Sequence, residues 1–295
     1  MDITGPMFIQ TVVGGIFTGS VYALVALGLT IMFGVMRVLN LAHGAFVMLG
    51  AYLVFWSYTL LHMNPFLSML VVAMPVLFIL GVLNQKWLIS RLFNIPDEDF
   101  ELMSAIFCFG LSGFIINLAI YFWTADFRSV RYIAESITFG GISFPKTRII
   151  CFVIAVAISL IVALFLKKAN LGRAIRATAQ NRDSAEICGI PTRRIFMFVF
   201  GLGCMLAAAG GSLLSVQYAI YPQMGDDYTT KSFCIIILGG LGSYFGAFWG
   251  GVILGLSEAI ATLFLGAKFS EAVAFMMLIL ILLIKPTGLF GEDDR

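Results

Sequence analysis

Charged side chains are scarce in this sequence. Asp, Glu, Lys and Arg make up 12% of the 295 residues, hydrophobic residues make up 60%, and the formal net charge is only +2. An ordinary soluble domain needs far more polar surface, so the composition predicts a protein with many membrane-spanning segments. Because the net charge is small and the cations gather in loops, nucleic acid is not an expected partner.

Motifs for catalysis and cofactor binding are also missing. The chain has no G-x-x-x-x-G-K-[ST] nucleotide loop, no H-E-x-x-H and no G-x-S-x-G, so it carries none of these routes to ATP or ester hydrolysis. Its two histidines, His43 and His62, are too separated to suggest a metal site, and its five cysteines show no C-x-x-C spacing. We therefore expect no metal, no cofactor and no enzymatic activity in this chain.

Long apolar runs dominate what is present. They predict an all-α, polytopic helical membrane protein that forms a single transmembrane domain over residues 1–295, with about eight or nine membrane segments. The expected continuous spans are Phe8–Phe33, Leu41–Leu61, Phe66–Asn84, Leu102–Trp123, Ile149–Leu166, Ile195–Ile220, Tyr244–Leu265 and Ala272–Ile284.

One further segment is expected to be discontinuous. The apolar run Phe233–Leu238 is too short to cross a bilayer, and Gly239, Gly240 and Gly242 follow it directly. Broken backbone at membrane depth is tolerated only where it is buried in protein or lines a watery cavity. We expect this break to lie next to the polar break at Asn40–His43.

The loop over residues 124–148 is too long and polar for a tight turn. Its sequence alternates on both sides of Gly140-Gly141, which predicts a small β-hairpin on the membrane face. The positive-inside rule places the basic loop 167–194 in the cytoplasm, and alternation of spans then places the N-terminus and the 124–148 loop outside. The basic residues of that outer loop depart from the rule.

The basic loop 167–194 holds seven of the eighteen Lys and Arg residues. Its alanines and long side chains predict a short helix over residues 173–190, ended by Gly189 and Pro191. A small charged helix on the cytoplasmic side suits a docking site for a soluble partner. The candidate contact residues are Arg173, Arg176, Arg182, Asp183, Ser184, Ala185, Glu186 and Gly189.

Polar residues also interrupt the second span. Asn40 and His43 are three positions apart and share a helix face, and Gly44 follows them. Polar groups are costly inside a bilayer unless they are satisfied, which leaves two interpretations open. The residues either line a substrate path or hinge, or they make interhelical hydrogen bonds that fix packing.

Glu258 is the carboxylate that lies well inside an apolar span. An unpaired charge there costs at least about 2.5 kcal/mol, so its default interpretation is functional. The alternative is structural neutralisation by Lys268 or by the amide of Asn40.

Small residues recur along the same span and along the first one. Gly242, Gly246, Gly250, Gly251 and Gly255 follow the small-xxx-small pattern that lets helices approach closely, and Gly15 and Gly19 do likewise. We favour close helix packing as their role, with a subunit interface or a sliding surface as the alternative.

Four ordered segments together carry a resemblance to a known family. They are Gly19–Leu29, Asn40–Gly44, the loop from Gly172 to Ile190, and the closing Pro286–Gly291. These segments resemble the permeases of branched-chain amino-acid ABC importers, and the chain is most similar to their shorter, LivH-type inner-membrane subunit. In such permeases an E-A-A…G loop contacts the ATPase. Here Asp183-Ser184-Ala185 and Gly189 stand at the matching spacing, with Asp for Glu and Ser for Ala.

The resemblance implies a complex in a bacterial-type cytoplasmic (inner) membrane. Its other members are a second permease subunit, two cytoplasmic ATP-binding subunits and an extracytoplasmic substrate-binding protein. Whether the cargo is a branched-chain amino acid, urea or another short amide or carboxylate stays open. An ion-coupled secondary transporter that titrates Glu258 and His43 is the alternative mechanism, and an intramembrane enzyme is a third.

For an importer we expect a translocation path lined by small and apolar residues of the first, second and eighth segments. Asn40, His43, Gly44 and Glu258 are the candidate wall residues. The path should hold no strong counter-ion pair, because the binding protein supplies affinity and tight binding midway slows release.

Overall fold

The computed structural model describes residues 5–94, 97–130, 132, 135–139, 142–285 and 287–291. Its longer helices are α1 (Gly5–Met36), α2 (His43–Leu61), α4 (Met74–Trp87), α5 (Asp97–Trp123), α6 (Lys146–Lys168), α9 (Thr192–Ser215) and α11 (Tyr244–Leu265). Its shorter ones are α3 (Pro65–Ser68), α7 (Asn170–Gln180), α8 (Arg182–Ile187), α10 (Met224–Gly239) and α12 (Ser270–Ile284). A π-helical turn, Met69–Ala73, joins α3 to α4, and 3-10 turns cover Ile89–Asn94 and Ala267–Phe269.

Seven helices in this described part of the chain are long and apolar enough to cross a membrane. They include the combined segment Pro65–Leu92 and agree with the first six expected spans and with Tyr244–Leu265. The expected span Ala272–Ile284 lies within α12, an apolar helix shorter than the roughly 20 residues that a bilayer core requires. The all-α prediction is therefore confirmed, with seven candidate spans.

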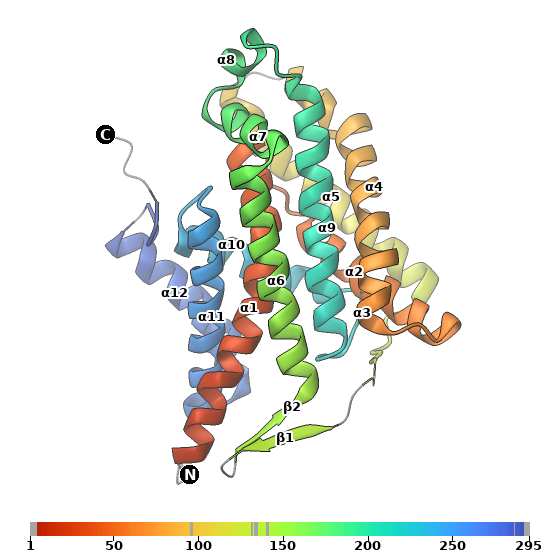
Figure 1. The fold of residues 1–295 in the computed structure, drawn as a ribbon, viewed down its shortest axis with the longest axis vertical. Coiled ribbons are helices and arrows are strands. Elements are labelled where there is room, and N and C mark those ends of the chain that lie inside the picture. The colour runs from red at the N-terminus through yellow and green to blue at the C-terminus, as the bar shows by residue number, and fades with distance from the viewer. Residues whose placement is uncertain are drawn as a thin grey trace.

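The molecule has two ends that differ in chemistry. The basic helices α7 and α8 lie at one end, and the N-terminus lies at the other together with the strands β1 (Ser136–Phe139) and β2 (Ile142–Pro145) (Figure 1). We call these the basic end and the N-terminal end. The strands pair antiparallel with Phe139 opposite Ile142, so the predicted hairpin is confirmed, although its Gly140-Gly141 tip lies outside the described residues.

Basic residues of the 124–148 loop are held by the protein itself. The Arg128 backbone pairs with Ile220 in both directions, its guanidinium donates to the Trp123 carbonyl, and it lies 5.0 Å from the centre of the Trp56 ring. Lys146 forms an ion pair with Glu135, and that hydrogen bond and charge hold the pKa of Glu135 below its usual range. These contacts explain how cations are accommodated at the N-terminal end.

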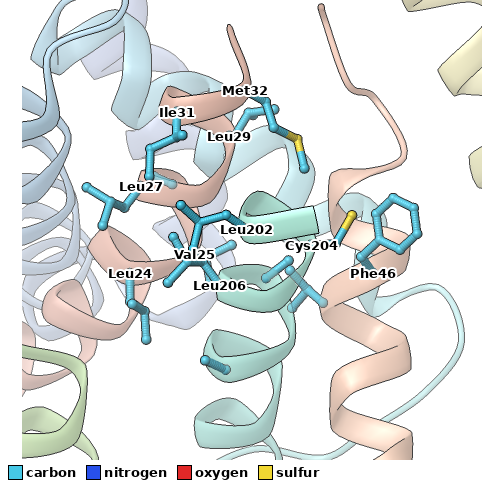
Figure 2. Packing of buried hydrophobic residues seen from close by; sticks show 14 of the residues in the cluster. Leu24, Val25, Leu27, Leu29, Ile31, Met32, Phe46, Leu202, Cys204 and Leu206 are labelled. Carbon is cyan, nitrogen blue, oxygen red and sulfur yellow. The ribbon is translucent and has the colours of Figure 1, made fainter. Parts of the chain in front are cut away.

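The core lies where α1, α2 and α9 meet. Almost every α1 residue from Gly19 to Met32 is buried, and so is most of α9, because these two helices are enclosed by the rest of the bundle. Figure 2 shows apolar side chains of the three helices packed together, with Leu24, Val25 and Met32 from α1, Leu206 from α9 and Phe46 from α2. By contrast, α5 and α12 expose long apolar side chains, as expected of helices that face lipid or another subunit.

Glycines bring α1 and α11 into backbone contact. A Cβ at Gly19 would lie 2.7 Å from the carbonyl oxygen of Gly251, and one at Gly15 would lie 2.8 Å from the Ala259 side chain. On α10, Gly239 abuts the backbone of Gly246 in the same way. The predicted packing role of these glycines is confirmed within the chain.

The two polar breaks make different contacts, and the expectation that they neighbour each other or a cavity stays a prediction. Gly44, at the first break, contacts Gly225 and Thr229 near the start of α10, whereas α10 ends at Gly239 and Gly242 packs against Gly34 of α1. Fourteen helical residues, or about 21 Å, separate Gly225 from Gly239. Each break is buried against α1 by a different contact.

Replacing Gly19 by Val should destabilise the protein by about 1–3 kcal/mol, because the new side chain collides with α11 backbone that cannot yield. The matched control is Gly113→Val on α5, where a Cβ meets no atom within 4 Å. Thermal unfolding in detergent, followed by size-exclusion fluorescence, measures both. Equal melting temperatures for the two variants would contradict the packing assigned to Gly19.

Candidate functional site

The basic end carries a helical arm formed by α7 and α8, inserted between α6 and α9 (Figure 1). The sequence predicted one helix here, and the structure has two. Asn181 separates them with extended backbone, and its side chain caps α8 by accepting the Ser184 N–H at 2.8 Å. An Asn directly before a run of helix formers is a start signal that the single-helix prediction overlooked.

The inner face of the arm fixes it to the bundle. Ile175 is fully buried, and a Cβ at Gly172 would lie 2.5 Å from the carbonyl oxygens that end α6. The Arg176 guanidinium donates to the Leu166 carbonyl, so this candidate contact residue points toward α6. A cation at the last carbonyls of a helix also complements its dipole.

The outer face is exposed and charged. Arg173, Arg182, Asp183, Ser184 and Glu186 are all exposed, while Ala185 packs inward. Arg182 pairs with Glu186 at 3.6 Å across one helical turn.

Ile187, at the tip of the arm, is 87% exposed and was not singled out from the sequence. A single exposed aliphatic side chain is common on protein surfaces and does not by itself mark a binding site.

Gly189 ends the arm with left-handed backbone, φ +81°. Its N–H donates to the Glu186 carbonyl at 2.9 Å, and the next N–H, of Ile190, donates to the Ala185 carbonyl at 3.0 Å. These bonds satisfy the last carbonyls of α8, and a side chain with a branched Cβ would strain this conformation. The glycine therefore sets the direction in which the chain enters α9.

Asn40, His43 and Gly44 are fully or nearly fully buried and are engaged with neighbouring helices. The side-chain Oδ1 of Asn40 accepts the Ala42 N–H at 3.1 Å, and the side-chain Nδ2 donates to the Met32 sulfur at 3.3 Å. The His43 Nε2–H donates to the Val25 carbonyl of α1 at 2.9 Å. These contacts favour the packing interpretation of the pair.

A polar cavity of about 660 Å³ lies in the half of the molecule nearer the N-terminal end. Its walls come from α1, α10, α11, the first turn of α6 and the loop after α9, and three wall positions on α1 and α11 are glycines. The polar lining residues are Gln10, Thr11, Thr18, Tyr22, Arg148, Tyr218, Tyr228, Lys231, Glu258 and Thr262. Asn40, His43 and the second span take no part in it.

Glu258 pairs with Lys231 in this cavity. The Lys231 Nζ lies 3.0 Å from Oε1 and 3.1 Å from Oε2 of Glu258, and it also donates to the Tyr22 hydroxyl at 3.1 Å. Neither Lys268 nor Asn40, the two partners considered from the sequence, supplies the neutralising group. The expected absence of a strong counter-ion pair concerned the translocation path and stays a prediction, but the polar cavity that contains Glu258 does hold such a pair.

Comparison with known proteins shows the family of the chain. The family model for the branched-chain amino acid transport system / permease component matches residues 11–282. The high-affinity branched-chain amino acid transport permease BraD of Pseudomonas aeruginosa is 30% identical over 97% of both chains. LivH of Escherichia coli K12 is 31% identical over 97% of this chain and 96% of its own. The chain belongs to this permease family.

The relatives extend beyond bacteria. The probable branched-chain amino acid transport permease LivH of Methanocaldococcus jannaschii is 30% identical over 95% of this chain and 91% of its own. Seven apolar helices together with these family members identify a multi-pass inner-membrane protein.

Lys231 is a charged residue of the polar cavity that sequence reasoning missed. It lies in α10, two residues before the apolar run Phe233–Leu238, and a lysine so close to such a run is a signal that was available. Its partner Glu258 is 27 residues away on the following helix, and no spacing rule predicts that contact. Only the antiparallel packing of α10 on α11 brings the two charges together.

Replacing Gly189 by Val should strain the end of α8 by roughly 1–2 kcal/mol, the cost of left-handed backbone for a side chain. Gly189→Asn should cost less, since Asn tolerates that conformation. Amide hydrogen exchange in the 182–192 peptide should be roughly 5–30-fold faster in the Gly189→Val variant than in the wild-type protein. Equal exchange in the Val and Asn variants would show that the φ of Gly189 does not hold the arm.

Proposed function

We propose that this chain is a membrane-spanning permease subunit of an ATP-binding-cassette importer for branched-chain or related small amino acids. Its assembly contains a second permease subunit, two cytoplasmic ATP-binding subunits and an extracytoplasmic substrate-binding protein. The family of the chain and the names of BraD and LivH support the substrate class. The positive-inside rule supports a cytoplasmic basic end and an extracytoplasmic N-terminal end.

The exposed arm α7–α8 is the observation on which the coupling proposal rests. It carries no ATP site of its own, its inner face is fastened to the end of α6, and it leads directly into α9. A partner that pushes the arm therefore displaces both helices. We propose that the loop 167–194 contacts the ATPase and transmits its conformational change to α6 and α9. The contact residues are the exposed ones, Arg173, Arg182, Asp183, Ser184, Glu186 and Ile187. Arg176, Ala185 and Gly189 instead keep the arm in its conformation.

We also propose a finer account of the membrane domain. The whole chain acts as one transmembrane domain of nine segments, made of the seven long helices with α10 and α12 embedded among them. The break at Gly239–Gly242 then lies within the protein, since Gly240 abuts Gly291 and Gly242 abuts Gly34. Burial of this kind is what makes irregular backbone tolerable near a bilayer.

Two alternatives differ in testable ways. A urea or short-amide importer has the same architecture but a neutral cargo. A secondary transporter needs titrating groups in its path, and the hydrogen bond of His43 to the α1 backbone, outside the polar cavity, does not favour that use.

Proteoliposomes that contain the four kinds of subunit should take up leucine only when ATP is inside and the binding protein is outside. Uptake should persist when a protonophore collapses the proton gradient. Uptake driven by a proton gradient without ATP would replace this proposal with the secondary-transporter mechanism.

Changing Asp183 to Lys, or Ile187 to Asp, should lower ATP-driven uptake at least tenfold, because each change removes an exposed contact from the arm. Asp126→Lys, the same charge reversal at an exposed position of the N-terminal end, is the matched control. All variants should insert into the membrane in normal amounts. Normal uptake in both arm variants would remove the arm from the coupling interface.

A further inference from the structure

We propose that the polar cavity is a transient binding site for a zwitterionic α-amino acid. The ligand separates the Lys231–Glu258 ion pair, so that its carboxylate pairs with Lys231 and its ammonium group pairs with Glu258. This inference rests on the proposed function and adds to it a binding site and a charge rule for the cargo. The site lies on the side that the binding protein would face.

The ion pair lies at the inner limit of an accessible cavity. The side chains of Lys231 and Glu258 are 16% and 9% exposed, so both are largely removed from solvent yet both line the cavity. Charges in such a position are costly unless paired, and in membrane proteins they usually mark a substrate or ion pathway.

Aromatic groups hold the lysine in place. Its Nζ lies 4.6 Å from the centre of the Tyr22 ring and 5.9 Å from that of Tyr228, in addition to its hydrogen bond with the Tyr22 hydroxyl. Cation–π contacts of this kind stabilise an ammonium group without neutralising it. Lys231 therefore keeps partners when its carboxylate is exchanged for that of a ligand.

Charge balance selects the ligand class. A zwitterion that opens the pair offers a carboxylate to Lys231 and an ammonium group to Glu258, so that no charge is left alone. A simple carboxylate leaves Glu258 unpaired, a simple amine leaves Lys231 unpaired, and a neutral amide such as urea offers neither charge. An uncompensated charge in a desolvated site is strongly unfavourable, so ligands with both charges are preferred.

Arg148 adds a second cation at the wall of the cavity. A Cβ at Gly14 would lie 3.6 Å from its guanidinium, which places Arg148 against the bare backbone of α1. The three charged side chains that line the described cavity thus sum to one positive charge, which attracts the carboxylate end of the ligand first.

The remaining walls impose little choice of side chain. Apart from the polar groups, the lining consists of Met7, Ala259 and three glycines, and the volume lies within the roughly 300–1,000 Å³ of ordinary ligand pockets. Such walls accept an aliphatic side chain of any branching. The site therefore recognises the carboxylate and ammonium groups of the amino acid, and selection of its side chain is made by the binding protein.

Saturation-transfer NMR on the complex of permeases and ATPases in nanodiscs, without the binding protein, tests the site. Leucine should receive saturation from the protein. 4-Methylpentanoate and 3-methylbutylamine, which each lack one of its charges, should receive at least tenfold less, and urea none. Equal transfer to either single-charge analogue, or none to leucine, would overturn the inference.

Variants separate a ligand role from a structural one. Lys231→Met and Glu258→Gln should abolish the leucine signal and lower uptake at least tenfold, whereas the same changes at exposed positions, Lys86→Met and Glu101→Gln, should do neither. If a single variant assembles poorly because it leaves one charge unpaired, the neutral double variant should restore assembly but not leucine binding or uptake. Wild-type uptake in the double variant would show that the pair is only structural.

These outcomes are distinct from failure of the proposed function. If the wild-type complex fails to import leucine with ATP, the importer assignment falls. If it imports leucine normally and the cavity variants do so too, the importer assignment stands and only the zwitterion site is rejected.

Discussion

Backbone contact through glycine is the constraint on which the rest of this structure depends. Helices in lipid gain little from the hydrophobic effect, so their association relies on close van der Waals packing. Gly15, Gly19, Gly251 and Gly255 let α1 and α11 touch, and Gly28 and Gly203 do the same for α1 and α9. With α1 enclosed in this way, the polar cavity keeps its walls, and the ion pair at its inner limit is shielded from lipid.

The Lys231–Glu258 ion pair links the helices that surround the polar cavity. It ties α10 to α11, and through the Tyr22 hydroxyl it ties α10 to α1. Three elements that form the cavity are thus joined by groups that water or a charged ligand can separate. The arm at the other end contacts α6 and α9, and Arg148 in the first turn of α6 lines the same cavity. The proposed route from ATPase to cavity therefore runs along helix α6.

Sequence reasoning succeeded where one strong local signal decided the outcome. Apolar runs long enough to cross the hydrocarbon core of a bilayer predicted the long helices. The alternation on both sides of Gly140-Gly141 predicted the hairpin, and the glycine spacing predicted close helix packing. It failed where tertiary contacts decide. The Asn181 cap split one predicted helix into two, and Asn40 and His43 proved not to line the polar cavity. The partner of Glu258 came from a helix whose packing no pattern in the chain encodes.

We proposed that the polar cavity lies on the extracytoplasmic side and that the ATPases act on α6 and α9 through the arm. From these two proposals we expect the cavity to be accessible from outside at rest and to lose that access when the ATPases engage. The most direct test is thiol labelling of a Thr18→Cys variant, because Thr18 lines the cavity. The variant is made in a Cys188→Ser background, since Cys188 is the exposed one of the five native cysteines. The account predicts labelling by a charged, membrane-impermeant thiol reagent from outside, lost when the ATPases are trapped with vanadate, while Leu160→Cys on the exposed face of α6 stays unlabelled. Labelling of the Thr18 position only from the cytoplasmic side, or at an equal rate in the resting and trapped states, would contradict it.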